Sequence, residues 1–269
     1  MALSTFAGGR LWGARYGAGR PWALALPGWG RDHRDFDAVL EGLDAVALDL
    51  PGFGVAPEPP AAWSTREYAR FIAPVLDDLA DGPVVAVGHS FGARVAVHLV
   101  TGPAPAEPTS AEPASERKIA ALVLTGAPLA LAPGSAPSRP ALAYRAGRAL
   151  HRAGLLSSER MEGLRRKHGS EDYRQASEVM RGVLVKAVQE TANGTYMPAL
   201  RQWVSAGGSL ELVWGDRDQV ASLPGLQAQL TGPPVVHAAL TLVPGAGHLI
   251  TPALAVQLRA ALLRSRPQR

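Results

Sequence analysis

The sequence contains no cysteine among its 269 residues, and this absence excludes several kinds of site. Without thiols the chain can form neither a disulfide framework nor a thiolate metal site, and it has no catalytic thiol. The spacings of metal ligands, phosphate-binding glycine loops and dinucleotide fingerprints are missing as well. We therefore expect a protein that needs neither a metal nor a cofactor.

Long apolar runs are also missing. No stretch reaches the roughly 18 consecutive apolar residues that a membrane-spanning helix needs. The first ten residues lack the charged region and following apolar run of an export signal. From these two absences we expect a cytoplasmic protein with no membrane partner.

The excess of charge of one sign is small, and lysine is rare. The formal net charge is +4 at pH 7, and lysine occurs only at positions 118, 167 and 186. The basic residues are scattered rather than gathered in a stripe, which argues against a nucleic-acid partner. With 47% hydrophobic residues, a chain of this length can bury one large core.

Short apolar runs bounded by turn residues recur along the chain and predict buried strands. They span Trp22–Leu26, Ala45–Leu50, Pro83–Gly88, Ile119–Thr125, Leu210–Gly215 and Ala239–Val243, and Leu11–Tyr16 is a candidate antiparallel edge strand. Helical patterns lie between most of them. This alternation predicts an α/β fold with a mostly parallel, twisted sheet flanked by helices.

Two of the predicted helices carry clear start signals. A capping box at Ser64-Thr-Arg-Glu67 opens a helix that we expect to run to about Leu79. Thr251 and Pro252 supply an N-cap and a first-turn proline for the last helix.

Two stretches interrupt the alternation of strands and helices. Residues 102–116, rich in Pro, Ala, Ser and Glu, show no periodicity and predict a flexible surface loop. Residues 136–205 carry only helical patterns, and we interpret them as a helical lid. The lid is inserted into a catalytic domain made of residues 1–135 and 206–269. Its apolar residues favour a hydrophobic substrate site, and its arginines either steer an anionic substrate or are simply solvated.

The strongest chemical signal is the segment Gly88-His-Ser90-Phe-Gly92, which follows an apolar strand and precedes a helical pattern. A serine on a sharp strand-to-helix turn needs small residues two positions before and after it. The helix would also direct its positive N-terminus at the reaction site. This setting predicts that Ser90 is a nucleophile, and the alternative is a purely structural turn.

Four further motifs make the chain resemble the α/β-hydrolase superfamily over nearly its whole length. They are Pro27-Gly-Trp-Gly30, similar to the oxyanion loop; Asp49-Leu-Pro-Gly-Phe-Gly54, similar to a second glycine-rich turn; Leu212-Val-Trp-Gly-Asp-Arg-Asp218, similar to the stretch that ends in the acid; and Pro244-Gly-Ala-Gly-His248, similar to the histidine loop. The order Ser, Asp, His also matches the family. The resemblance implies the α/β-hydrolase fold with an inserted helical lid.

The resemblance also implies a catalytic triad of Ser90, His248 and Asp218. A serine hydroxyl needs a base to take its proton, and the base needs an acid that holds it in the right tautomer. Asp216 also follows the same strand, and its other interpretation is a turn residue that bonds its own backbone. The spacing of the family motif favours Asp218.

The other histidines and Asp49 have plainer interpretations. His89 lies within the turn around Ser90, and we expect its side chain to point away from the nucleophile. The remaining histidines, at positions 33, 98, 151, 168 and 237, are expected to be solvated or structural. Asp49 lies at a strand end before Pro-Gly, which is typical of a structural turn residue.

Two backbone N–H groups are expected to stabilise the charge that develops on the substrate's carbonyl oxygen. Phe91, directly after the nucleophile, supplies one, and the resemblance implies that Trp29 supplies the other. The chain departs from the family at Pro27, where a histidine is common. A Pro-Gly pair suits a type II turn, but the hydrogen bonds of that histidine are lost.

These observations together predict a serine hydrolase that cleaves a small, largely hydrophobic carboxylic ester or thioester through an acyl-enzyme on Ser90. Serine at this position argues against the dehalogenase and epoxide hydrolase branches, whose intermediate needs a carboxylate nucleophile. Carbon–carbon bond hydrolysis and cofactor-free perhydrolysis use the same triad, and a non-catalytic ligand-binding protein is the alternative from another class. The expected partner is a small-molecule acyl substrate, and a monomer or a homodimer fits the sequence.

Overall fold

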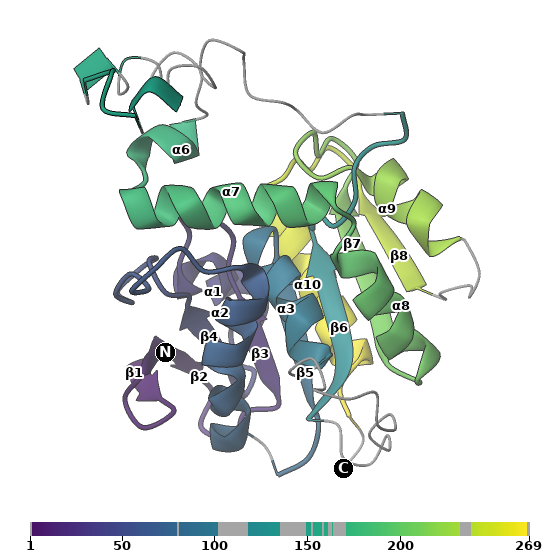
Figure 1. Cartoon of the computed structure of the whole chain (residues 1–269). Coiled ribbons are helices and arrows are strands. Elements are labelled where there is room, and N and C mark those ends of the chain that lie inside the picture. Colours follow the sequence, from purple (N-terminus) through teal and green to yellow (C-terminus); the bar gives the residue numbers. More distant parts are fainter. Residues whose placement is uncertain are drawn as a thin grey trace.

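In the computed structural model the chain folds around one eight-stranded sheet with helices on both of its faces (Figure 1). The structure describes residues 2–79, 81–101, 118–134, 149–151, 153–157, 159–160, 163, 171–231 and 238–267. The strands are β1 (Ala2–Phe6), β2 (Leu11–Tyr16), β3 (Ala23–Leu26), β4 (Ala45–Asp49), β5 (Val84–His89), β6 (Ile119–Thr125), β7 (Ser209–Gly215) and β8 (Ala238–Val243). Their order in the sheet is β1-β2-β4-β3-β5-β6-β7-β8.

Neighbouring strands from β4 to β8 pair in parallel, whereas β2 pairs antiparallel with both β1 and β4, so among the described strands β2 runs against the others. The predicted mostly parallel sheet flanked by helices is therefore confirmed. The segment Leu11–Tyr16 is antiparallel as expected, but it is not the edge strand, because β1 pairs with its outer side. Most of β1 is exposed, so its sequence carries little of the apolar pattern that reveals the buried strands.

The helices surround this sheet. They are α1 (Asp37–Leu40), α2 (Thr65–Ile72), α3 (Phe91–Val100), α6 (Glu171–Gln175), α7 (Glu178–Ala192), α8 (Tyr196–Ser205), α9 (Leu223–Leu230) and α10 (Pro252–Arg264), with short 3-10 helices at His33–Phe36 and Ala73–Asp78. The predicted capping box is present, since Ser64 and Glu67 each accept the other's backbone N–H. The α-helix ends at Ile72 rather than near Leu79, because Pro74 cannot donate the N–H that an α-helix would need.

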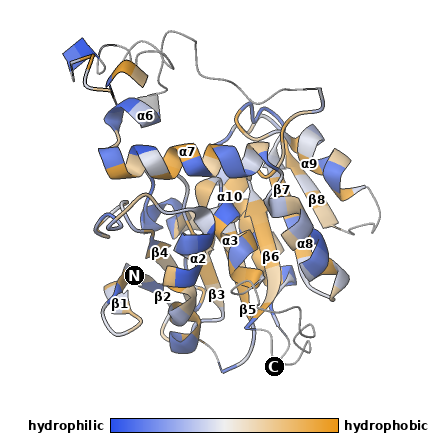
Figure 2. Cartoon of the chain, in the orientation of Figure 1, coloured by the Kyte–Doolittle hydropathy of each residue, from blue (hydrophilic) through white to orange (hydrophobic). Residues whose placement is uncertain are grey.

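Two hydrophobic cores lie on opposite faces of the sheet, and alternate residues of the central strands divide between them. Leu24 and Leu26 of β3 face the core under α2, α3, α8 and α9. Ala23 and Ala25 of the same strand face the core under α1 and α10. Figure 2 shows the strands as a mostly hydrophobic layer between helices with mixed outer surfaces. Because both of their faces are buried, the central strands are mostly apolar. β8, which the sequence predicts as a buried strand, is instead largely exposed.

The segment predicted as a lid holds two long helices in its described part. α7 crosses above the carboxyl ends of the central strands (Figure 1), and its Thr191 hydroxyl donates to the Pro128 carbonyl at 2.6 Å. α8 lies lower, and its Leu200 and Trp203 are buried in the same core as α3. The predicted loop 102–116 and residues 136–148 of the predicted lid lie outside the described residues. The division into a catalytic domain and a lid stays a prediction.

Across the described ranges, no helix combines the length and the apolar character that crossing a membrane requires.

Candidate active site

Ser90 lies on the sharp turn between β5 and α3, with φ of 50° and ψ of −108°. A positive φ is costly for a residue with a side chain, and among the described residues other than glycine it occurs only here and at Ala7. A Cβ at Gly88 would come within 2.6 Å of the Ala93 Cα, and one at Gly92 would collide with the carbonyl oxygens of Leu26 and Pro27 at the end of β3. The two glycines are thus required by the backbone of this turn.

The structure brings Ser90, His248 and Asp218 together at the carboxyl ends of the parallel strands. The Ser90 Oγ lies 3.0 Å from the His248 Nε2. The His248 Nδ1 lies 3.1 Å and 3.0 Å from the two carboxylate oxygens of Asp218. Each residue follows a different strand, β5, β8 or β7, and the parallel arrangement collects these three ends at one edge of the sheet.

The surroundings of Asp218 favour the ionised form of its carboxylate. Its side chain is 1% exposed, and it accepts the backbone N–H groups of Val220 at 2.8 Å and Ala221 at 3.0 Å. Burial alone would raise the pKa of Asp218, but the hydrogen bonds with His248 and these N–H groups outweigh it and hold the pKa below its usual value. An ionised carboxylate at this point can orient the His248 imidazole.

Asp216 has a different role. It is exposed, and its carboxylate accepts the backbone N–H of Gly245 at 2.7 Å. The expectation that it would bond its own turn is therefore wrong in detail, because its partner lies 29 residues further on. The contact ties the end of β7 to the loop that carries His248, and the carboxylate that reaches the imidazole is that of Asp218.

The oxyanion-loop segment lies against the turn of Ser90. The ring of Trp29 packs edge-on against Phe53, with ring centroids 5.0 Å apart, and against Phe91, with centroids 5.6 Å apart. A Cβ at Gly28 would lie 3.4 Å from the Ser90 Cβ. The structure therefore places both Trp29 and Phe91 beside the nucleophile, as the motif predicts, and their backbone N–H groups stay the predicted oxyanion donors.

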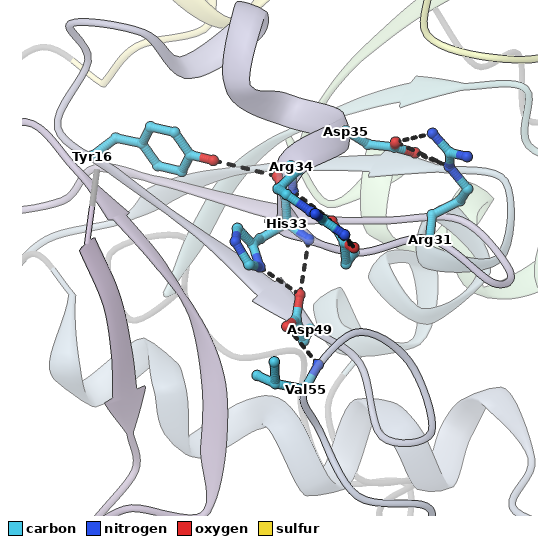
Figure 3. A network of polar contacts seen from close by, with 8 residues as sticks. Tyr16, Arg31, His33, Arg34, Asp35, Asp49 and Val55 are labelled. Carbon is cyan, nitrogen blue, oxygen red and sulfur yellow. Dashed lines mark hydrogen bonds and ion pairs between the residues drawn. The ribbon is translucent and has the colours of Figure 1, made fainter.

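The buried carboxylate of Asp49 contacts the chain directly after the oxyanion loop. Asp49 accepts two hydrogen bonds from His33, one from the His33 backbone N–H at 2.8 Å and one from the His33 Nδ1 at 2.8 Å. It also accepts the Val55 backbone N–H at 3.1 Å (Figure 3). Asp49 is thus more than the local turn residue that the sequence predicts. It links the chain after Trp29 to the second glycine-rich turn.

Asp32, His33 and Asp49 are the described residues whose ligand atoms lie close enough together, within 4.8 Å, to be compared with a metal site. Both oxygens of Asp49 already accept protein donors. The Asp32 carboxylate accepts hydrogen bonds from Arg34. The group therefore fits an internally paired anchor for the loop.

Two histidines are buried, and for His98 this favours the structural over the solvated interpretation. His89 and His98 are each 1% exposed, and burial lowers the pKa of each ring to about 4. Of the others, the His151 Nδ1–H donates to the Leu156 carbonyl oxygen at 2.8 Å, and positions 168 and 237 lie outside the described residues. A histidine in a buried position gives no sequence signal beyond its apolar neighbours.

His98 should make the protein sensitive to acid. Because the folded pKa lies below the unfolded value, the unfolded chain binds more protons, and stability falls as pH drops from about 6.5 toward 4. We expect His98→Leu to reduce the loss of unfolding free energy between about pH 7.5 and about pH 5 by roughly 2 kcal/mol. Urea unfolding at the two pH values measures this, and an unchanged loss would show that His98 is not held neutral.

The model of the Alpha/beta hydrolase family matches residues 8–260, and the chain therefore belongs to this family. Lipase LipV of Mycobacterium tuberculosis is 45% identical over 60 residues, which are 22% of this chain and 23% of that protein. Esterase Rv0045c of the same organism is 35% identical over 94 residues, which are 34% of this chain and 32% of that protein. The matches thus span less than a third of either relative.

A solved structure shows the same fold over nearly the whole chain. The thioesterase domain from the curacin biosynthetic pathway superimposes with a TM-score of 0.63 at 20% identity, covering 97% of this chain and 98% of that domain.

Proposed function

We propose that this α/β hydrolase cleaves small, largely hydrophobic carboxylic esters or thioesters through an acyl-enzyme on Ser90. One observation carries the proposal: the continuous hydrogen-bond chain from the Ser90 Oγ through the His248 imidazole to the Asp218 carboxylate. The names of the two matching relatives, a lipase and an esterase, support an ester as the substrate.

In the proposed reaction the His248 Nε2 takes the Ser90 hydroxyl proton while the Oγ attacks the acyl carbon. The Asp218 carboxylate accepts a hydrogen bond from the Nδ1–H of His248 and stabilises the imidazolium that forms. The backbone N–H groups of Trp29 and Phe91 stabilise the carbonyl oxygen as it becomes negative. The imidazolium then protonates the leaving alcohol or thiol, and water, activated by the same base, releases the acid.

The side chains around Ser90 support an apolar acyl group. Trp29 is partly exposed, and its ring packs on the buried rings of Phe53 and Phe91 next to the nucleophile. Above them, Met180 of α7 approaches the glycine-rich turn so closely that a Cβ at Gly52 would lie 2.5 Å from its sulfur. The described part of the proposed lid thus contributes a flexible apolar side chain to this region.

A substrate panel tests the proposal. We expect turnover of p-nitrophenyl esters with short and medium acyl chains, and of an acyl thioester, with slower turnover of charged acyl groups. A vinylogous diketone and a peroxide-dependent assay test the carbon–carbon hydrolase and perhydrolase alternatives. Exclusive activity on the diketone would reject the ester proposal, and inactivity on the whole panel would favour the non-catalytic alternative.

A further inference from the structure

The side chain of His89 is buried at the point where three segments of the candidate site meet. It belongs to the turn that carries Ser90, and its Nε2 lies 2.9 Å from the backbone carbonyl oxygen of His248. Its ring centroid is 5.1 Å from that of His248. On a third side a Cβ at Gly28 would lie 2.8 Å from the His89 Nδ1. The sequence predicts only that this side chain points away from the nucleophile, and its contact with the His248 loop is a feature that the sequence does not reveal.

The two ring nitrogens of His89 define its tautomer. A carbonyl oxygen only accepts hydrogen bonds, so the Nε2 must carry a proton and donate it to His248. The Nδ1 is buried and has no hydrogen-bond partner among the described residues. A proton on the Nδ1 would leave a buried donor unsatisfied, which is costly, so this nitrogen is unprotonated. The lowered pKa agrees with a ring that is neutral at pH 7.

His248 is consequently held at two points. The Asp218 carboxylate holds its ring, and His89 holds its backbone. The contact with Asp218 selects the tautomer and rotation of the His248 ring. The contact with His89 fixes the position of the His248 backbone relative to the nucleophile turn. Both are needed to keep the Nε2 in reach of the Ser90 Oγ, because a displacement of about 1 Å can cost about 100-fold in rate.

We propose that His89 is a positioning residue that fixes the His248 loop to the nucleophile turn and supports Gly28 of the oxyanion loop. This inference rests on the proposed serine hydrolase function. It assigns His89 no proton transfer, because its Nε2 proton is committed to a backbone oxygen and the Nε2 of His248 is the nitrogen that faces Ser90.

A pair of substitutions separates the hydrogen bond from simple packing. His89→Met keeps the approximate volume but removes the donor, and we expect kcat to fall about 10- to 100-fold while KM changes less than about threefold. His89→Gln keeps an N–H group at a similar reach and should restore most of the lost rate. Equal losses in both variants, or no loss in the methionine variant, would overturn the proposal.

The tautomer provides a second test that needs neither activity nor a substitution. In a long-range ¹H–¹⁵N correlation spectrum of the histidine-labelled wild-type chain, we expect His89 to be neutral and protonated at Nε2 near pH 7. A proton on Nδ1, or a cationic ring, would contradict the proposal even if the variants did not fold. A wild-type chain with this tautomer but no hydrolase activity would reject the proposed function and leave the structural contact standing.

Discussion

A Ser90→Ala variant is expected to hydrolyse ester substrates about 10⁶-fold more slowly than the wild-type chain. Without the Oγ the acyl-enzyme cannot form, and only water positioned beside the oxyanion donors remains as a nucleophile. Steady-state kinetics with the best p-nitrophenyl ester of the panel measures the effect. The fold should survive, because alanine retains the Cβ and removes only one oxygen.

Ser205→Ala is the matched control for this substitution. Ser205 is exposed at the end of α8, and we expect its replacement to leave kcat unchanged. A Ser90→Ala variant that keeps more than about one per cent of the wild-type rate, with an unchanged melting temperature, would show that hydrolysis does not pass through Ser90.

An Asp218→Asn variant is expected to lose about 10⁴-fold in kcat. An asparagine can donate to the His248 Nδ1 instead of accepting from it, which places the imidazole proton on the nitrogen that must receive the Ser90 proton. The same change also removes the negative charge that stabilises the imidazolium. The loss should appear in kcat far more than in KM, because the carboxylate lies behind the base and away from the substrate.

Asp216→Asn is the matched control two residues away. The amide oxygen of asparagine can still accept the Gly245 N–H that Asp216 accepts, so we expect less than about a threefold change in kcat. If Asp216→Asn caused the larger loss, the exposed carboxylate would be the catalytic acid, and the geometry around His248 would have to change in the working enzyme.

The parts of the fold that the sequence predicts well are those with a local signal. The central strands are buried on both faces, so an unbroken apolar run marks each one. The capping box of α2 and the N-cap Thr251 are both confirmed. They are predictable because their hydrogen bonds join residues only three positions apart. β1 carries no such signal, since it is exposed at the edge of the sheet.

The candidate site likewise contains residues that a local motif predicts and residues that only tertiary packing places. Ser90, Asp218 and His248 stand in short motifs, each after a strand, and parallel pairing alone brings such strand ends together. His89 could not be assigned from the sequence, because its partner lies 159 residues away and the contact depends on how two loops meet. The hydrogen bonds from His33 to Asp49, which lies 16 residues further on, likewise depend on tertiary packing.

The central claim is that Ser90 is an activated nucleophile, and a fluorophosphonate tests it most directly. We expect the folded wild-type chain to gain one adduct, which peptide mass spectrometry places on Ser90, and Asp218→Asn to label far more slowly. Denatured chain and Ser90→Ala should gain no adduct. A folded wild-type chain that stays unlabelled, or that is labelled at another residue, would contradict the claim.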